Sequence, residues 1–561
     1  MLGLSRSALR SLRAAAAALA LAASASASAS ASASPAAYSY ARPAAAGAEA
    51  PPEAPAPRQR RRPLFAPRET AAEELARVLR GALGAEAVET DAAELAAFGR
   101  DLYSHHGAGG PAPELVAFPR SAADVQLVVR ECARLGVPLV PRGAGTSLEG
   151  HVTTPLRGCV LDCSRMDAVL AVRPDDLDCT VQAGVRWQEL NKQLAPLGLF
   201  FAVDPGPGAC VGGMVGTGCS GTNAMRHGTM RANVVALEAV LADGSLVKTA
   251  SRARKSSAGY DLTGLLTGSE GTLAVVTAAT LRLQPLPAAT AVAVSSFASV
   301  RAAAACAAAL LRAGVPVAAV ELLDAPMVGA VNAQSGFAYP PQPLLLLKLA
   351  GASAARVADD ARRVEALAAE HGGSAFAFAD DAAGRERLWE ARKVALWSAG
   401  AQHPGKSVAT TDVCVPLSRL PDLLADFEAV SRGSALPVYA VAHAGDGNAH
   451  HFIVFDADAP AEVAEAKRLN SLLVRRAIAL EGTCTGEHGT GVGKLQYLEE
   501  ELGAGNLRVM RAIKRALDPQ GLLNGGKKVP AERAAGGAAP AQAQAQAPEL
   551  PLFVGAPACM Q

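Results

Sequence analysis

The feature that most constrains this chain is the density of glycine between residues 205 and 228. Eight of these 24 residues are glycine, and the segment begins Pro205-Gly-Pro-Gly208. Glycine has no side chain to pack and proline cannot donate a ladder hydrogen bond, so the segment does not suit a sheet interior. It is expected to be a loop whose backbone approaches another group closely.

Gly216, Gly218 and Gly221 in this segment match the G-x-G-x-x-G spacing of nicotinamide-dinucleotide sites, and Glu238 follows Gly216 by 22 residues. That fingerprint requires a hydrophobic strand running into the first glycine and a helix opening after it. Here the approach is rich in glycine and proline, and residues 222–228 are polar and reach another glycine. The sequence therefore argues against a Rossmann-type nicotinamide site.

A second glycine-rich segment, Pro141-Arg-Gly-Ala-Gly-Thr-Ser147, ends a predicted strand–helix–strand unit. Backbone N–H groups that are not crowded by Cβ atoms form nests that bind phosphate oxygens. Residues 141–147 and 212–228 together suit one large dinucleotide such as FAD, because two separate loops can hold a single pyrophosphate. The alternative is that these glycines only form tight turns.

Composition excludes several classes of protein. The 53 basic and 52 acidic residues give a net charge of +1, whereas nucleic-acid-binding domains carry a basic excess. No run of 18 large apolar residues occurs, so a membrane-spanning helix is not expected. The ten cysteines form no Cys-x-x-Cys pair and are interpreted as mostly buried thiols in a reducing compartment.

The two ends of the chain differ in composition from the rest. Residues 1–48 contain no acidic residue but carry arginines at 6, 10, 13 and 42 and an Ala-Ser repeat. That composition is typical of an organelle transit peptide, with the mitochondrion favoured over the plastid. The alternative is a secretory signal whose apolar core is residues 14–23. A proline-rich linker follows, and residues 534–548 predict a disordered Ala/Gln/Gly/Pro tail.

The segment between these ends alternates strands and helices. Ser121 and Asp124 form the pattern of a capping box at the start of a helix over 121–135. Other predicted helices cover 73–83 and 187–194, and strands are expected at 114–118, 137–140, 159–162, 168–172, 179–183, 234–241 and 246–249. Two further blocks of β-α-β type, over 291–371 and 412–480, predict an α+β cap domain built on one sheet.

Four of the ten histidines lie between residues 443 and 488. His443 and His450 flank a glycine-rich turn, and Glu487-His488 lies in another glycine-rich segment. Two histidines and one carboxylate are a common ligand set for a divalent metal that keeps positions open for substrate. The alternative is that they are ordinary core or surface histidines. His451 is left out, because in a strand it points to the face opposite His450.

Arg392 lies in the segment Arg387-Leu-Trp-Glu-Ala-Arg-Lys393. If this segment is helical, Leu388 shares a face with Arg392, and Trp389 shares one with Lys393. An arginine near a large aromatic side chain suits bidentate capture of a substrate carboxylate. The alternative is a surface cation.

Five separated motifs occur in one order: residues 141–150, 213–221, 268–273, 443–450 and 486–489. Together they resemble the D-lactate dehydrogenase (cytochrome) family, part of the vanillyl-alcohol-oxidase/para-cresol-methylhydroxylase-like flavoproteins. Residues 248–262 and 411–420 are most similar to plant mitochondrial members. The resemblance extends from about residue 75 to 530.

The resemblance implies an α+β fold with a two-part α/β FAD-binding domain and an α+β (ferredoxin-like) cap domain. The implied boundaries are 1–63 for transit peptide and linker, 64–285 for the FAD domain, 286–490 for the cap, 491–531 for a helical return to the FAD site, and 532–561 for a disordered tail. The implied contacts to non-covalent FAD are Arg142, Gly143, Ala144, Gly145, Thr146, Ser147, Pro205, Gly206, Gly213, Gly218, Ser220, Gly221, Gly228, Glu270, Gly271, Val276 and Asn524.

The resemblance also implies the chemistry. His443, His450 and Glu487 match metal ligands for manganese or zinc, His488 matches the catalytic base, and Arg392 matches a carboxylate-binding arginine. The implied reaction oxidises D-lactate to pyruvate by hydride transfer to the flavin, with cytochrome c as acceptor, in the mitochondrion. D-2-hydroxyglutarate and glycolate are the alternative substrates. The resemblance further implies a role in methylglyoxal detoxification and a homodimer. It implies no nucleic-acid partner and no transmembrane segment.

The chain departs from the family pattern at two places. The usual Asn-Pro-Gly-Lys is Asn524-Gly-Gly-Lys527 here, and the loss of proline is expected to loosen that turn. Related D-2-hydroxyglutarate dehydrogenases have a lysine where this chain has Thr410 or Thr411. The missing cation argues against a second substrate carboxylate.

Overall fold

The structure is a computed structural model that describes residues 70–102, 104, 106 and 110–532. The predicted transit peptide lies outside the described residues, as does the predicted tail apart from Glu532. The chain divides into the units Met1–Pro67 and Arg68–Gln561, and the description below concerns the second.

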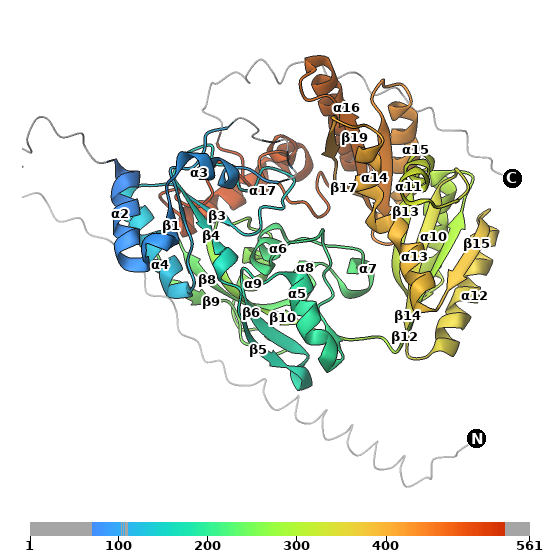
Figure 1. Cartoon of the computed structure of the whole chain (residues 1–561), viewed down its shortest axis with the longest axis horizontal. Coiled ribbons are helices and arrows are strands. Elements are labelled where there is room, and N and C mark those ends of the chain that lie inside the picture. The colour runs from blue at the N-terminus through green and yellow to red at the C-terminus, as the bar shows by residue number, and fades with distance from the viewer. Residues whose placement is uncertain (1–69, 103, 105, 107–109, 533–561) are drawn as a thin grey trace, which may run out of the picture. The chain divides into compact units, whose positions relative to one another are not determined.

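The first sheet has the order β1-β2-β4-β3 and is parallel across β2, β4 and β3. Its strands are β1 (Val88–Glu89), β2 (Leu115–Ala117), β3 (Leu139–Arg142) and β4 (Cys159–Asp162). The helices α2 (Ala71–Leu83) and α4 (Ala122–Leu135), blue in Figure 1, share one apolar core with these strands. The predicted capping box at Ser121 and Asp124 begins α4, so this prediction is confirmed.

The second sheet is antiparallel, in the order β5-β6-β10-β8-β9. Its strands are β5 (Val169–Arg173), β6 (Asp178–Gln182), β8 (Val234–Leu241), β9 (Leu246–Lys248) and β10 (Ala274–Arg282). Helix α5 (Trp187–Leu194) has the predicted bounds. The central strand β10 was not predicted from the sequence.

The glycine-rich segment is not a loop throughout, contrary to expectation. Residues Val211–Thr217 form helix α6 and Ala224–His227 form helix α7. Val211, Met214 and Val215 recur at helical spacing and are buried in the core of the second sheet. Their burial outweighs the helix cost of the glycines between them.

The cap sheet has eight strands, seven of them in the order β15-β12-β14-β13-β18-β19-β16, with β17 also paired to β19. Its strands are β12 (Ala289–Ser296), β13 (Val317–Leu323), β14 (Leu344–Gly351), β15 (Ser374–Ala379), β16 (Ser407–Thr410), β17 (Val413–Cys414), β18 (Val438–His443) and β19 (Asn448–Phe455). The order β15-β12-β14-β13 is that of a ferredoxin-like unit. The chain is therefore α+β, as predicted.

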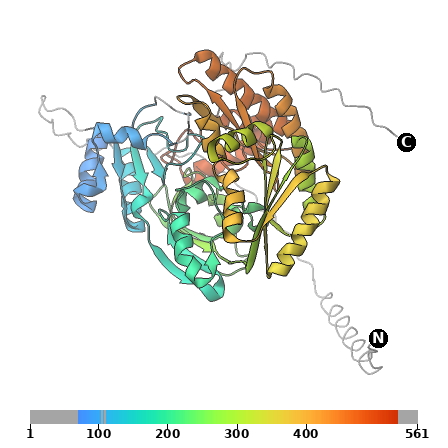
Figure 2. The same cartoon turned by 45° about the vertical axis from the view of Figure 1, so that its right-hand side comes forward.

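Helices cover both faces of the cap sheet, shown in yellow to orange in Figures 1 and 2. One face packs against α10 (Val300–Arg312), α12 (Ala354–Glu370), α15 (Leu420–Ser431) and α16 (Pro460–Ala479). The other face packs against α11 (Ala325–Ser335), α13 (Ala382–Lys393) and α14 (Ala395–Ala401). The sequence predicted the helices of the first face but not α11 or α14.

The last long helix, α17 (Leu498–Leu517), returns to the first part of the chain. Ile513 and Leu517 pack on the core of the second sheet, and Lys514 Nζ donates to the carbonyl oxygens of Thr272 and Leu523. Within the described residues no helix is both long and apolar enough to cross a membrane.

Candidate functional site

One large cavity, about 1030 Å³, is lined by residues of both sheets of the first part, of the cap and of the C-terminal return. A ligand larger than an ordinary drug-sized molecule fits such a volume. All the predicted FAD-contacting residues line it except Gly218, Ser220 and Gly228. Gly218 and Gly228 end α6 and α7 with positive φ, so their role here is to shape the backbone.

The first glycine-rich loop leaves β3 and forms one wall of this cavity. A Cβ atom on Gly143 would lie 2.3 Å from Cys210 Sγ, so only glycine fits there. Gly145 has a φ of +69°, a conformation that L side chains rarely adopt. Arg142 is held in place by Asp162, whose carboxylate lies 2.5 Å from its Nη1. The loop therefore packs its backbone closely against Cys210 and lines the cavity, and its contact with FAD stays a prediction.

Asn524 lies at the cavity wall although the turn lacks the family's proline. Its side-chain amide donates to the carbonyl oxygens of Glu270, at 2.6 Å, and His151, at 3.3 Å. Lys527 Nζ donates to Asn524 Oδ1 at 2.5 Å. Buried hydrogen bonds therefore fix this turn where the proline is missing. His151 itself is buried, with Nε2 at 3.2 Å from the Glu270 carboxylate.

The predicted metal ligands meet at the cap side of the cavity. His443 ends β18 and His450 lies on β19 opposite Val441, so both point to the same face of this hairpin. Glu487 Oε1 lies 3.1 Å from His443 Nε2 and 3.0 Å from His450 Nε2. The ligand atoms of the three residues lie within 4.8 Å of one another. His451 points away and contacts Phe427 instead, as expected.

The hydrogen bonds of these imidazoles indicate a shared cation. His450 Nδ1 lies 3.0 Å from the Thr411 carbonyl oxygen and His443 Nδ1 lies 2.8 Å from the Glu321 carboxylate, so both Nδ1 atoms donate. In a neutral ring the Nε2 lone pair would then face the lone pairs of Glu487. A proton or a metal ion between them removes this repulsion. Ligating histidines in metal sites show the same pattern of N–H donation.

The electrostatics of the cluster accord with this interpretation. Burial alone would lower the pKa of His443, but the charges of Glu321 and Glu487 hold it well above the ordinary value. Burial would raise the pKa of Glu487, but His443 and His450 hold it well below the ordinary value. Both shifts favour a protonated His443 beside an ionised Glu487 in this buried cluster.

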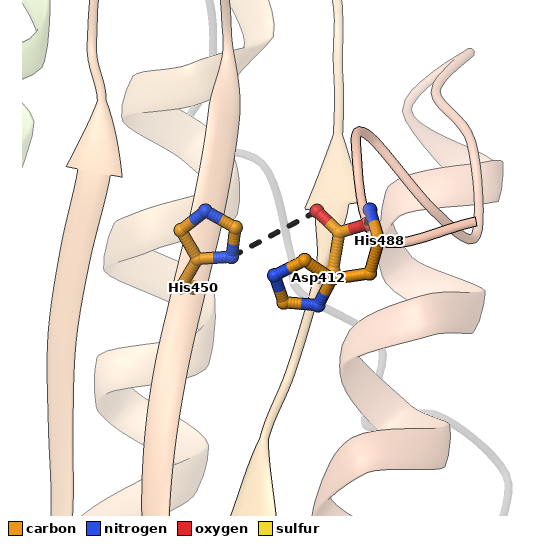
Figure 3. A group of neighbouring side chains, drawn as sticks. All are labelled: Asp412, His450 and His488. Atoms are coloured by element: carbon orange, nitrogen blue, oxygen red, sulfur yellow. Dashed lines mark hydrogen bonds and ion pairs between the residues drawn. The ribbon is translucent and has the colours of Figure 1, made fainter. Parts of the chain in front are cut away.

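His488 lies beside the cluster of His443, His450 and Glu487 and lines the cavity. Its ring stacks on that of His450 with centroids 4.9 Å apart (Figure 3). Burial lowers the pKa of His488, so the imidazole is neutral near pH 7 and can accept a proton. Its Nδ1 is buried and makes no hydrogen bond to the described residues.

Asp412 organises the segment that carries His488, and the sequence analysis did not identify it. Its Oδ2 accepts the backbone N–H groups of Glu487 and His488 and the hydroxyl of Thr485. Burial would raise its pKa, but the charges of His488 and His450 lower it to about 2. Its other oxygen points toward His450 Nδ1, 3.8 Å away (Figure 3).

Arg392 lies on α13, so the segment is helical, and it lines the cavity. Its Nε donates to Glu321 at 2.6 Å, and the same carboxylate accepts from His443. Glu321 thus joins Arg392 to His443, and the sequence analysis did not identify it. The available signal was a carboxylate inside the apolar strand Val317–Leu323, where every residue is buried.

Comparisons with known proteins identify FAD-related family models and relatives of this chain. Residues 113–250 match the model of the FAD binding domain, and residues 286–528 match that of the FAD linked oxidases, C-terminal domain. The chain is 46% identical over 418 residues to the mitochondrial D-lactate dehydrogenase [cytochrome] of Arabidopsis thaliana, covering 74% of each chain. It is 41% identical to the probable mitochondrial D-lactate dehydrogenase of Danio rerio, covering 82% of this chain and 93% of the relative.

More distant similarities concern other activities. A glycolate oxidase subunit of Escherichia coli is 33% identical, with 74% of this chain and 84% of the relative covered. The solved structure of 4-ethylphenol oxidase from Gulosibacter chungangensis superposes with a TM-score of 0.68 at 17% identity, covering 82% of this chain and 98% of that chain. At that identity the superposition shows the fold alone.

Proposed function

The chain belongs to the D-lactate dehydrogenase (cytochrome) family of FAD-dependent oxidoreductases, and from this premise we propose that it oxidises D-lactate to pyruvate in the mitochondrion. One observation carries the proposal. Arg392, the cluster of His443, His450 and Glu487, and His488 come from separate segments, and all line the cavity that also receives the glycine-rich loops. The relative that is a glycolate oxidase subunit has lower identity, so glycolate is the weaker alternative.

The residues of the first part fit FAD. The loop from Pro141 to Ser147 presents backbone N–H groups where a side chain on Gly143 would clash, and the volume accommodates a dinucleotide with a small substrate beside it. FAD supplies the hydride acceptor when bound. The protein would position the cofactor, because the loop from Pro141 to Ser147, Pro205 and Asn524 would hold it against the cap.

Arg392 binds the substrate carboxylate in this proposal. Its Nε is already held by Glu321, which fixes the plane of the guanidinium, and the remaining N–H groups suit a carboxylate. Holding the carboxylate orients the hydroxyl-bearing carbon toward the cofactor. Pre-organisation of this kind lowers the entropic cost of reaching the reactive geometry.

His443, His450 and Glu487 would hold a divalent metal ion, manganese or zinc. Such an ion would supply Lewis-acid chemistry that lowers the pKa of a substrate hydroxyl group. His488 then removes the hydroxyl proton, because its buried imidazole is neutral and faces the cavity. Cytochrome c is the proposed acceptor of the electrons, in keeping with the names of the relatives.

The test is an anaerobic visible spectrum of the purified protein before and after D-lactate, with L-lactate as the matched control. Bleaching of the flavin band by D-lactate alone supports the function and the stereochemistry together. A flavin band that D-lactate leaves unchanged would refute the proposed substrate.

Removal of the metal is a separate prediction. Dialysis against a chelator should abolish D-lactate-dependent bleaching while the flavin stays bound, because the ligands lie in the cap and the cofactor loops do not. Addition of Mn²⁺ or Zn²⁺ should restore bleaching. Full activity in metal-free protein, verified by elemental analysis, contradicts the assignment.

A further inference from the structure

Lys348 is a cation in the cavity that the mechanism above does not use. It lies on β14, where Leu344, Leu345, Leu346, Leu347 and Leu349 are buried, and it lines the cavity. Its Nζ lies 4.1 Å from the ring centroid of Trp389. No hydrogen bond or ion pair joins this ammonium to any residue that the structure describes.

The nearby carboxylates are already engaged by other groups. Asp204 accepts from the Thr222 hydroxyl and the Asn223 backbone N–H. Glu321 accepts from Arg392 and His443. Lys348 is therefore a partly buried charge with an aromatic contact but no anion of its own. Burial lowers the pKa of this ammonium, and the charges of Asp204 and Glu321 oppose that effect.

The position of this ammonium relates it to the substrate carboxylate. Trp389 and Arg392 are three residues apart on α13, so their side chains leave the same face of that helix. Lys348 contacts Trp389, and Lys348 and Arg392 both line the cavity. Two cations that line one cavity suit a substrate that carries two carboxylates.

We propose that Lys348 determines substrate specificity by binding an anionic oxygen at the far end of the substrate, so that the site also takes D-2-hydroxy acids with a second carboxylate. The inference rests on the proposed function and names a further substrate class for the same site. Thr410, which also lines the cavity, is uncharged, whereas β14 supplies a cation to the same cavity from another strand.

A reduced flavin is the other source of an anionic oxygen in this cavity. The experiment separates the two by comparing D-2-hydroxyglutarate with D-2-hydroxyhexanoate, which has a similar length and no distal charge. It uses the full holoenzyme and two readouts for each compound. The first readout is the dissociation constant of the matching oxo acid, 2-oxoglutarate or 2-oxohexanoate, measured from perturbation of the oxidised flavin spectrum. The second readout is the anaerobic rate of flavin reduction by the hydroxy acid itself.

In Lys348→Met, affinity for the dicarboxylic compounds should fall by about 10-fold or more relative to the monocarboxylic ones, since a charged hydrogen bond is lost. Lys348→Arg should retain the wild-type ratio. Lys467→Met is the matched control, because Lys467 is exposed on α16 outside the cavity, and its ratio should equal that of the wild type.

Three results would overturn the inference. The ratio stays unchanged in Lys348→Met, or wild-type protein binds the dicarboxylic compounds no better than the monocarboxylic ones. Alternatively, Lys348→Met weakens every compound equally and shifts the flavin midpoint potential, which assigns the ammonium to the flavin. A wild-type flavin that D-lactate does not reduce would instead refute the proposed function, and the binding ratio would still report on Lys348.

Discussion

At the scale of single residues, the site depends on buried charges that satisfy one another. Glu321 is surrounded by an apolar strand, yet Arg392 and His443 hold its pKa below the ordinary value against the effect of burial. Removing one member of such a group leaves another charge buried without a partner, which costs more than the net stabilisation of the group. Substitutions at these positions therefore need matched controls.

His488 gives the sharpest prediction at this scale. Replacing it with Ala should slow flavin reduction by D-lactate about 10²- to 10⁴-fold, the usual contribution of a general base. The flavin should stay bound, because His488 is not in the cofactor loops. Stopped-flow absorbance measures the rate, and His371→Ala, outside the cavity at the end of α12, is the control. An unchanged rate would refute the role of His488 as base.

Asp324 provides a prediction about pH and stability. It caps α11, accepts from Met327 N, and burial raises its pKa from 3.8 to about 7. Because the folded state binds the proton more tightly than the unfolded state, stability falls as the pH rises from about 4 to about 7. At about 1.4 kcal/mol per pKa unit, ionisation of buried Asp324 above pH 7 lowers the free energy of unfolding by an amount on the order of a few kcal/mol.

Asp324→Asn should remove that loss of stability and keep the cap, since asparagine caps helices as well as aspartate does. The gain in Tm over the wild type should therefore be larger at pH 8 than at pH 5, as measured by calorimetry. A gain of equal size at both pH values would contradict the explanation.

At the scale of elements, the cap hairpin and the glycine-rich loop place the chemistry. The register of β18 against β19 puts His443 and His450 on one face, and a shift by one residue would turn one of them to the other face. The conformation of the loop from Pro141 to Ser147 depends on glycine, which has no side chain. Gly143 packs its backbone against Cys210, which lies at the N-terminal cap of α6.

Gly143→Ala should lower the flavin content of the purified protein at least ~10-fold, because the new Cβ would overlap Cys210 Sγ at 2.3 Å and displace the loop. The double variant with Cys210→Ala should regain flavin, since the next nearest atom to that Cβ is 3.5 Å away. Gly81→Ala, with open space around it on α2, serves as the control. Failure of the double variant to recover would show that the clash is not the cause.

At the scale of the whole molecule, one buried lysine joins the two large parts of the folded chain. Lys494 has 1% of its side chain exposed, lies 3.6 Å from Glu149 of the first part, and donates to the carbonyl oxygen of Asp412 at the edge of the cap. Glu149 also contacts His106. This arrangement couples the cap to the loop that follows β3.

Lys494→Met should destabilise the protein by about 3–5 kcal/mol, the cost of leaving Glu149 buried without its cation. Thermal unfolding should then show the cap and the first part melting separately. Combining Lys494→Met with Glu149→Gln should restore part of the stability. If the single and double variants are equally unstable, the lysine does not act through Glu149.

The sequence by itself determined the fold class, the cofactor and the identity of the chemical groups. Periodicity, capping patterns and β-branched runs act locally, which is why α4, α5 and β4 were predicted within a residue. The glycine-rich motifs and the histidine motifs could be identified from the sequence, because each motif is a contiguous segment of the chain.

Only the tertiary structure decided which residues share the cavity. Lys348 lines the cavity with His488, and Glu321 and Asp412 hold residues that line it, yet the three are far apart in the sequence and no local pattern links them to His488. The helix within residues 211–217 likewise formed because three apolar side chains could be buried by the second sheet, an effect that depends on distant partners. Buried contacts of this kind are non-local, so they are a property of the packed molecule rather than of any segment.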